Sequence, residues 1–170
     1  MAETLLLTGA TGYIASHTWV ALHEAGYNVI GLDNLCNSSA EVVNRLAKIT
    51  GATPHFVEGD VRDRALLDRL FAEHKINGAI HFAALKAVGE SVSKPLEYYG
   101  NNLEGLITLC SAMQSAGVRQ LVFSSSATVY GNPHAMPILE NFPLSATNPY
   151  GQTKLMGEQI LRDLEISDPE

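Results

Sequence analysis

The stretch that decides the fold is Thr4-Leu5-Leu6-Leu7-Thr8-Gly9-Ala10-Thr11-Gly12-Tyr13-Ile14-Ala15-Ser16 in a sequence of 170 residues. Its apolar first half predicts a short buried strand that ends at Gly9, and an apolar-periodic helix is predicted from about Tyr13. The first N–H groups of a helix have no internal partner, and the helix dipole adds partial positive charge there. Gly9 and Gly12 leave room for the turn and for close phosphate oxygens. We therefore expect this loop to bind a diphosphate.

The glycine spacing is Gly-x-x-Gly-x-x-Ala, and a glycine loop alone is weak evidence because many such loops are plain turns. Here the loop is followed by a second predicted strand, residues 28–32, which ends in Asp33. A carboxylate about 20 positions beyond the loop can accept hydrogen bonds from a ribose diol and would repel a 2′-phosphate. This favours NAD over NADP as the cofactor, and a strand-end turn Asp is the alternative.

Strands and helices are predicted to alternate along the chain. Further strands are expected at 54–58, 79–84 and 120–124, and helices at 13–25, 40–49, 64–74, 95–116 and from 148 to about 164. Residues 86–91 are predicted as a loop, and 125–147 as a segment without regular structure. This pattern predicts an α/β fold, a Rossmann-type doubly wound parallel sheet of order 3-2-1-4-5. The cofactor is expected at the carboxyl ends of strands 1 and 4.

Composition limits the classes of function. The chain is 46% hydrophobic and 17% charged, which is typical of a globular domain, and its net charge of −7 argues against nucleic-acid or anionic-membrane binding. No apolar run approaches the ~18–20 residues of a membrane helix, and no signal peptide is recognised. Cys36 and Cys110 are expected to be reduced thiols of a cytoplasmic protein. No metal site is expected, since metal-ligand spacing is lacking among His17, His23, His55, His74, His81 and His134.

A second group of polar residues follows the last predicted strand. Ser124-Ser125-Ser126 lies directly after it, and Tyr150 and Lys154 are four residues apart on the last helix, hence on one helix face. A phenol has a pKa of ~10, which is too high for a base at neutral pH. A neighbouring ammonium favours the phenolate and lowers that pKa. Tyr150 and Lys154, with Ser126 as a bridge to a substrate hydroxyl, are therefore the candidate catalytic residues.

These motifs together resemble the extended short-chain dehydrogenase/reductases, and within them the UDP-glucose 4-epimerase family. The resemblance covers essentially the whole sequence. The strings that carry it are Thr8–His17, Leu32–Leu35, Glu58–Asp60, His81–Ser91, Lys94–Tyr99, Ser124–Gly131 and Asn148–Lys154. Related nucleotide-sugar dehydratases have an Asp-Glu pair where this chain has Ala127-Thr128, so an acid to eliminate water is missing.

The resemblance implies an NAD-dependent interconversion of UDP-glucose and UDP-galactose. Tyr150 would take the proton of the sugar 4-hydroxyl while C4 passes hydride to NAD+, Lys154 would lower the pKa of Tyr150, and Ser126 would relay the proton. The implied cofactor residues are Gly9, Gly12, Tyr13, Ile14, Asp33, Asn34, Asn37, Ser38, Asp60, Val61, Phe82, Ala83, Lys86, Asn101, Ser124, Ser125, Tyr150 and Lys154. A homodimer through the helices at 95–116 and 149–164 is also implied, with no nucleic-acid or membrane partner.

Two departures from the family stand out. Ala15 replaces the third glycine of the loop, so we expect a small displacement of the first helix and weaker NAD binding. The sequence also stops where the family is about half finished. We therefore expect residues 1–170 to be an incomplete NAD-binding Rossmann domain without the substrate-binding domain, an amino-terminal fragment that is inactive alone.

Two alternatives stay open at this point. The chain could be a non-catalytic NAD-binding module that kept the fold and lost the chemistry. It could also belong to another extended short-chain dehydrogenase/reductase that acts on nucleotide sugars, such as a decarboxylase or a dehydratase. The presence of Ser126, Tyr150 and Lys154 favours catalysis over the first, and Ala127-Thr128 disfavours the second.

Overall fold

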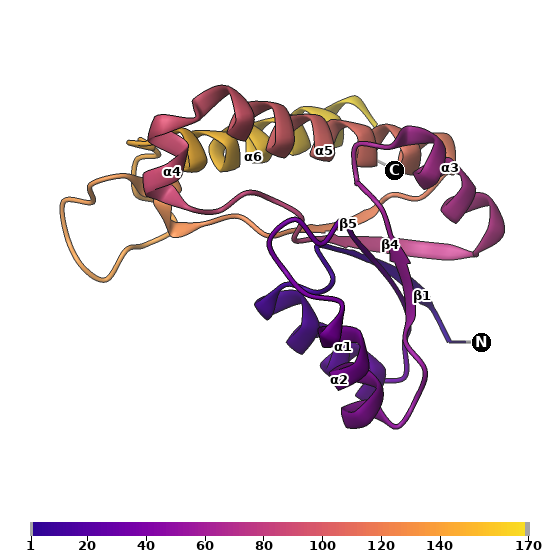
Figure 1. The fold of residues 1–170 in the computed structure, drawn as a ribbon. Helices are drawn as coiled ribbons and strands as arrows, with labels where there is room; N and C mark the ends of the chain where they lie inside the picture. Colours follow the sequence, from indigo (N-terminus) through magenta and orange to yellow (C-terminus); the bar gives the residue numbers. More distant parts are fainter. Residues whose placement is uncertain (1, 169–170) are drawn as a thin grey trace. The chain divides into compact units, whose positions relative to one another are not determined.

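The computed structural model describes residues 2–168, and within them the strands form one five-stranded sheet. All strand pairs are parallel, and the order is β3-β2-β1-β4-β5. The predicted fold class and strand order are therefore confirmed. The strands are β1 (Thr4–Thr8), β2 (Asn28–Asp33), β3 (His55–Glu58), β4 (Ile76–His81) and β5 (Gln120–Phe123) (Figure 1).

The chain divides into two compact units. The first consists of residues 2–83 and 105–124 and contains the sheet, and the second consists of residues 84–104 and 125–168. The first unit holds α1 (Tyr13–Glu24), α2 (Glu41–Thr50) and α3 (Arg64–Glu73). The second holds α4 (Val88–Ser93), η1 (Ala127–Tyr130) and α6 (Pro149–Ser167), whereas α5 (Pro95–Ser115) contributes to both.

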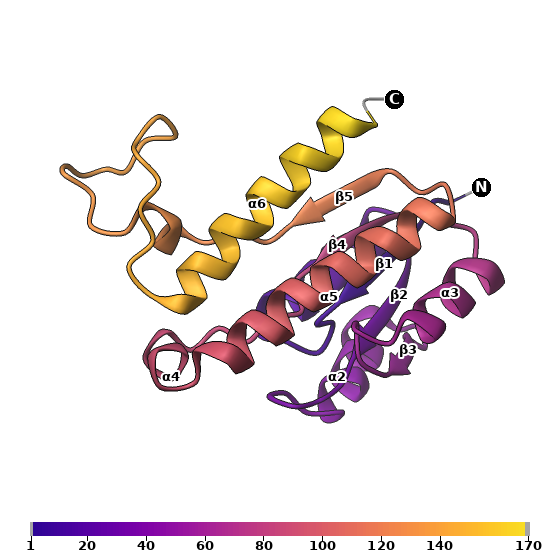
Figure 2. The same cartoon turned by 90° about the horizontal axis from the view of Figure 1, so that it is seen from above.

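Both faces of the sheet are covered in the first unit, because the apolar residues of each strand alternate between them. Leu7 is fully buried in a cluster with Trp19 of α1 and Leu46 of α2. Leu6, its neighbour in β1, is fully buried in a second cluster. That cluster also holds Leu67 of α3 and Leu109 of α5. The sheet is therefore doubly wound, with α1 and α2 on one face and α3 and the later part of α5 on the other (Figure 1). Figure 2 looks onto the face that carries α3 and α5.

The predicted helix ends are set by short local signals. Asp63 caps α3 by accepting the Leu66 N–H at 3.0 Å, and Asn148 caps α6 by accepting the Gly151 N–H at 2.9 Å. Gly26 and Gly117, just beyond the carboxyl ends of α1 and α5, have φ of +85° and +70°. Glycine adopts this left-handed conformation without strain, which explains why the helices stop there.

In the second unit, α4 and η1 each pack against α6. Gly151, in the first turn of α6, lies so close to η1 that an added Cβ would be 3.0 Å from the Thr128 carbonyl oxygen. The segment before α6 is held to η1 by the Ser145 N–H, which donates to the Val129 carbonyl at 2.9 Å.

Three element predictions need correction. The strand predicted at 79–84 is β4, which begins at Ile76 and ends at His81. Its first residues include Gly78, where an added Cβ would be 3.0 Å from the Gln120 carbonyl of β5, so a close strand neighbour explains the glycine. The loop predicted at 86–91 contains most of α4, and the segment predicted as irregular at 125–147 contains η1.

Candidate functional site

The glycine loop after β1 requires glycine at Gly9. Its φ is +67°, and an added Cβ would lie 2.7 Å from the backbone nitrogen of Ala83. Ala83 follows β4, and the neighbouring Phe82 N–H donates to the Thr8 carbonyl at 3.1 Å. The backbones that leave β1 and β4 are therefore in contact at the carboxyl edge of the sheet, where connections to the two sides diverge. Ligands of open α/β sheets bind at such a position.

The amino end of α1 directly follows this loop. Gly12 is the N-cap residue, and the first intrahelical bond runs from the Ser16 N–H to the Gly12 carbonyl at 2.9 Å. The N–H groups of residues 13–15 precede that bond and are the unpaired donors of a helix start. The side chains of Tyr13 and Ile14 are 73% and 60% exposed. This geometry can bind an anion by backbone N–H groups and the helix dipole.

Ala15 lies on the opposite side of the same helical turn. It is 1% exposed and belongs to the apolar cluster that contains Leu7 and Trp19. Its methyl group is thus packed between α1 and the sheet, where the fingerprint has a third glycine or an alanine. The weaker NAD binding expected from this methyl stays a prediction.

Asp33 ends β2 and is buried, with 8% exposure. Its Oδ2 accepts the Thr11 N–H at 3.0 Å, and its Oδ1 accepts the Leu35 N–H at 2.8 Å and the Ser38 hydroxyl at 3.3 Å. A carboxylate offers about four acceptor positions. The Asp33 carboxylate can thus accept one ribose hydroxyl at its remaining position. It can accept a second if the Ser38 hydroxyl donates instead to the Thr11 hydroxyl, which lies 2.6 Å from it.

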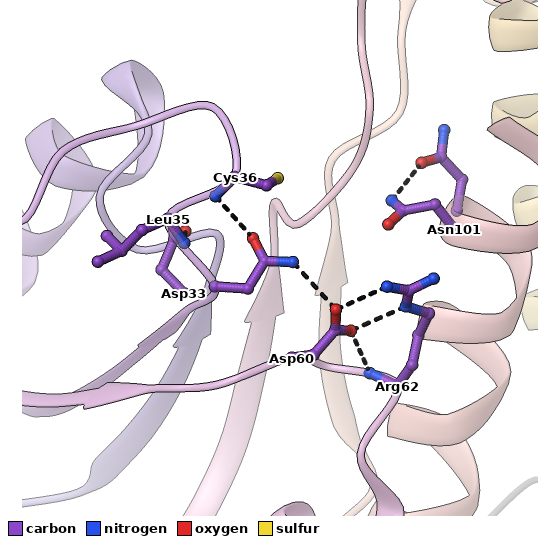
Figure 3. A network of polar contacts seen from close by, with 8 residues as sticks. Asp33, Leu35, Cys36, Asp60, Arg62 and Asn101 are labelled. Atoms are coloured by element: carbon purple, nitrogen blue, oxygen red, sulfur yellow. Dashed lines mark hydrogen bonds and ion pairs between the residues drawn. The ribbon is translucent and has the colours of Figure 1, made fainter. Parts of the chain in front are cut away.

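Asp60, after β3, is the centre of a second network (Figure 3). Arg62 donates to both carboxylate oxygens from its guanidinium, at 2.9 and 2.7 Å, and from its backbone N–H at 2.9 Å. The side chain of Asn34, after β2, donates to Asp60 at 3.0 Å. The hydrogen bonds from Arg62 are the main reason why the pKa of Asp60 lies well below its usual range. Arg62 is a member of this site that sequence reasoning missed.

The other predicted residues of the first unit differ in their surroundings. Val61 is 8% exposed and packs in the apolar core, where Gly105 leaves room for it. Asn37 is exposed in the loop after β2, whereas Phe82 is half-buried after β4. The Ser124 N–H continues the sheet by donating to the His81 carbonyl at 3.1 Å. All the predicted residues of this unit therefore follow strands at one edge of the sheet.

In the second unit, Tyr150 and Lys154 project from the first turns of α6. The Lys154 side chain is 4% exposed, and its Nζ lies 6.0 Å from the centroid of the Tyr150 ring. Burial lowers the pKa of Lys154 to about 8. Perturbed lysines of this kind are more frequent at functional sites than elsewhere.

Ser126 is the N-cap residue of η1, which packs against α6. Its Oγ accepts the Thr128 hydroxyl at 2.9 Å and the Thr128 N–H at 3.3 Å. Thr128 in turn packs against Gly151, the residue after Tyr150. Ser125 instead donates to Glu158, which also pairs with Arg162 at 3.0 Å. The structure thus brings Ser126 to the turn that carries Tyr150 and turns Ser125 to a later part of α6.

Lys86 lies in the short segment that precedes α4, and its side chain is exposed. The residues on each side of it are bonded to α5. Leu85 bonds to Asn102 through its N–H at 2.8 Å and its carbonyl at 3.0 Å, and the Ala87 N–H donates to the Tyr98 hydroxyl at 3.1 Å. Sequence reasoning named neither Asn102 nor Tyr98 as a site residue, although Tyr98 lies in the Lys94–Tyr99 string that carries the resemblance.

The six histidines were predicted as ordinary surface or core residues. His81 is 1% exposed in β4, and its Nδ1 lies 2.7 Å from the hydroxyl of Thr8. In the described range 2–168 no group of three or more His, Cys, Asp or Glu side chains is arranged to hold a metal ion. In the same range, every helix is too short or too polar to cross a membrane.

Comparison with known proteins agrees with this geometry. The profile of the NAD dependent epimerase/dehydratase family matches residues 5–167. UDP-glucose 4-epimerase of Bacillus subtilis (strain 168) is 60% identical over 166 residues, which are 98% of this chain and 49% of that protein. The relative from Yersinia pestis with the same name is 56% identical over 167 residues, again 98% of this chain and 49% of that protein.

A crystal structure of UDP-glucose 4-epimerase from Bifidobacterium longum in complex with NAD+ and UDP has a TM-score of 0.96 and 52% identity. The match covers 98% of this chain and 50% of that one. The sheet order and the helix-opening glycine loop define a Rossmann-type α/β protein. The chain belongs to the NAD dependent epimerase/dehydratase family. It spans about half the length of the curated relatives that it matches.

Proposed function

We propose that this chain binds NAD and carries the reacting side chains of a UDP-glucose 4-epimerase. The observation that supports it most is the loop at Gly9, where a left-handed glycine in contact with the backbone after β4 leads into the open amino end of α1. The relatives named UDP-glucose 4-epimerase at 60% and 56% identity support the reaction.

The residues after β1, β2 and β3 fit a dinucleotide. The backbone N–H groups of Tyr13 and Ile14 would hold the diphosphate at the start of α1. Asp33, with an acceptor position left on its buried carboxylate, would hold the adenosine ribose and disfavour a 2′-phosphate. Asn34, Asn37 and Ser38 would hold the same end of the cofactor, with Asp60 and Val61 near adenine.

The remaining proposed residues would line the rest of the cofactor site, with Lys154 bonded to the nicotinamide ribose. They are Phe82, Ala83, Lys86, Asn101, Ser124, Ser125, Tyr150 and Lys154. Bound NAD+ would supply an acceptor and then a donor of hydride for C4 of the sugar.

Tyr150, Lys154 and Ser126 would move the proton. Because burial lowers the pKa of Lys154 only to about 8, this side chain still carries its charge at pH 7, with its Nζ 6.0 Å from the centroid of the Tyr150 ring. The phenolate accepts the proton of the sugar 4-hydroxyl, and Ser126 relays it. When the hydride returns, Tyr150 gives the proton back, so that the residues end the cycle unchanged.

The proposal assigns different activities to these 170 residues and to a longer protein that includes them. Relatives of twice the length carry the name of the whole enzyme, so NAD binding is proposed for residues 1–170 and epimerisation of UDP-sugars for the longer protein. A cytoplasmic location is part of the proposal, supported by the free thiols of Cys36 and Cys110.

A homodimer through α5 and α6 is also proposed. Both helices expose large apolar side chains, including Leu96 at 85% and Ile107 at 49% on α5 and Met156 at 39% on α6. Large exposed apolar side chains on helices are typical of helical interfaces. Sedimentation equilibrium of the chain tests this, and a monomer at all concentrations would contradict it.

Calorimetric titration with NAD+ and NADP+ tests the cofactor. We expect NAD+ to bind more tightly than NADP+ and Ala15→Gly to bind NAD+ more tightly still. Tyr150→Phe in a protein that epimerises UDP-galactose should abolish turnover and leave NAD+ bound. Chain that binds neither dinucleotide would contradict the proposal, and NAD+ binding with full turnover in Tyr150→Phe would favour a different base.

A further inference from the structure

Asn102 is a buried amide on α5, 7% exposed, and it uses its whole hydrogen-bonding capacity within the second unit. Its Oδ1 accepts the Leu85 N–H at 2.8 Å and the side chain of Asn101 at 3.0 Å. Its Nδ2 donates to the Leu85 carbonyl and to the Thr153 hydroxyl, both at 3.0 Å. Figure 3 shows the side chain of Asn101 that takes part.

The partners of Asn102 are neighbours of the proposed reacting residues. Leu85 precedes Lys86, and a bond at both its N–H and its carbonyl fixes the orientation of the peptide that leads into Lys86. Thr153 donates onward to the Tyr150 carbonyl at 2.7 Å and precedes Lys154. One amide thus connects the Lys86 segment with the turn of α6 that carries Tyr150 and Lys154.

Tyr98, one turn earlier on α5, holds the other side of Lys86. Its ring is fully buried, and its hydroxyl accepts the Ala87 N–H at 3.1 Å and donates to Glu90 at 2.8 Å. Lys86 is therefore an exposed side chain on a short segment whose two neighbouring residues are both bonded to α5. Catalytic and binding groups need supporting contacts of this kind to stay within a productive geometry.

We infer that Asn102 is a positioning residue that couples Lys86 to the Tyr150–Lys154 turn through Thr153. The inference rests on the proposed function for its purpose, since it assigns no contact between Asn102 and cofactor or substrate. The hydroxyl of Thr153 joins the two halves of the network, because it accepts from Asn102 and donates to the carbonyl of Tyr150.

Two substitutions at Thr153 separate positioning from packing. Thr153→Val removes the hydroxyl and keeps the branched shape. Thr153→Ser keeps the hydroxyl and removes a buried methyl group. If the residue acted only through the packing of its methyl group, Thr153→Ser would impair NAD+ binding and the protection of Leu85 at least as much as Thr153→Val. Gln114→Ala, at an exposed position of α5, serves as the control.

Two quantities are measured on each variant. Calorimetry gives the dissociation constant of NAD+, and amide hydrogen exchange followed by NMR gives the opening of the Leu85 N–H, with the Leu109 N–H on α5 as the internal reference. We expect Thr153→Val to weaken NAD+ binding about tenfold and to speed exchange of Leu85 to a similar extent. Thr153→Ser should resemble the unaltered chain in both, although its thermal midpoint falls.

The outcomes distinguish this inference from the proposed function. Unchanged exchange of Leu85 in Thr153→Val overturns the inference, as does a loss of NAD+ affinity in Thr153→Ser equal to that in Thr153→Val. If the unaltered chain binds no NAD+ while Leu85 still responds to Thr153→Val, the coupling stands and the proposed function fails.

Discussion

Two carboxylates, Asp33 after β2 and Asp60 after β3, differ from Lys154 of α6 in what surrounds the charged group: hydrogen-bond donors surround the carboxylates, whereas Lys154 is buried. Asp33 and Asp60 accept hydrogen bonds from backbone N–H groups and from Arg62, and those bonds lower the pKa of Asp60. Lys154 is nearly fully buried, and burial lowers its pKa to about 8. The charge of Asp60 is therefore stabilised by the fold, whereas the charge of Lys154 costs stability. Such a cost is characteristic of groups selected for chemistry.

The largest loss of stability is expected from a substitution at Gly9, because an added side chain has no space at this carboxyl edge of the sheet. Gly9→Ala should lower the free energy of unfolding by about 3–5 kcal/mol and abolish NAD+ binding, because a Cβ would meet the Ala83 backbone at 2.7 Å. Gly26→Ala is the matched control, since Gly26 has a φ of +85° and no atom within 4 Å of the added Cβ. It should cost only about 1–2 kcal/mol. Equal losses in urea denaturation would contradict this account of Gly9.

Lys154→Met should stabilise the chain by up to about 3 kcal/mol at pH 7, because the pKa of the folded form is about 8 and the ordinary value is 10.5. Below pH 8 the Lys154 side chain is protonated in both the folded and the unfolded chain, and its buried charge lowers the free energy of unfolding by the full amount. Between pH 8 and 10.5 the folded chain loses the proton first, so its stability rises with pH and the advantage of Met disappears.

Denaturation of Lys154→Met and of the unaltered chain across pH 6–11 measures this difference. Lys48→Met, at an exposed position of α2, should show no such pH dependence. A Lys154→Met advantage that is constant with pH, or absent at pH 7, would show that burial does not destabilise the charge.

Asp60→Asn should have a smaller effect of the opposite sign. It removes the carboxylate that pairs with Arg62, and a loss of about 1–2 kcal/mol is expected at pH 7 because both side chains are partly exposed. The pKa of Asp60 is lowered in the folded chain from an ordinary 3.8. Its contribution is therefore present above that value and is lost as the pH falls below it. A difference from the unaltered chain that does not shrink as the pH falls from 5 to 2 would contradict this cause.

The smallest expected effect is on thiol reactivity and leaves stability unchanged. Burial raises the pKa of Cys110 to about 11. Cys36 is exposed in the loop after β2, and its pKa is also raised, by partial burial and by the charges of Asp33 and Asp60. Timed labelling with a maleimide should modify Cys36 first. Saturating NAD+ should slow that reaction and leave Cys110 as it was, and faster labelling of Cys110 would be inconsistent with its burial.

Local signals explain which parts of the fold could be predicted from sequence. Asp63, Asn148, Gly26 and Gly117 set helix ends through bonds or conformations within a few residues, so those ends were predicted closely. The strand order followed from alternation of strands and helices. In contrast, β4 was predicted three residues too late, because Gly78 and Asn77 interrupt its apolar pattern for reasons that lie in other strands.

The same limit applies to the candidate site. Asp33, Tyr150 and Lys154 belong to motifs and could be named in advance. Asn102 bonds to Leu85, 17 positions away, and to Thr153, 51 positions away, and nothing local marks such contacts. The burial of Lys154 also depends on the fold, so its lowered pKa could not be predicted from spacing.

The backbone amides at the start of α1 offer the most direct test of NAD binding. We predict that, when NAD+ is added to the isotopically labelled chain, the largest amide shift changes in its NMR spectrum occur at Gly12, Tyr13 and Ile14, with the Asp33 loop next. NAD+ that leaves these amides unchanged, or that shifts residues at the opposite edge of the sheet instead, would contradict the account.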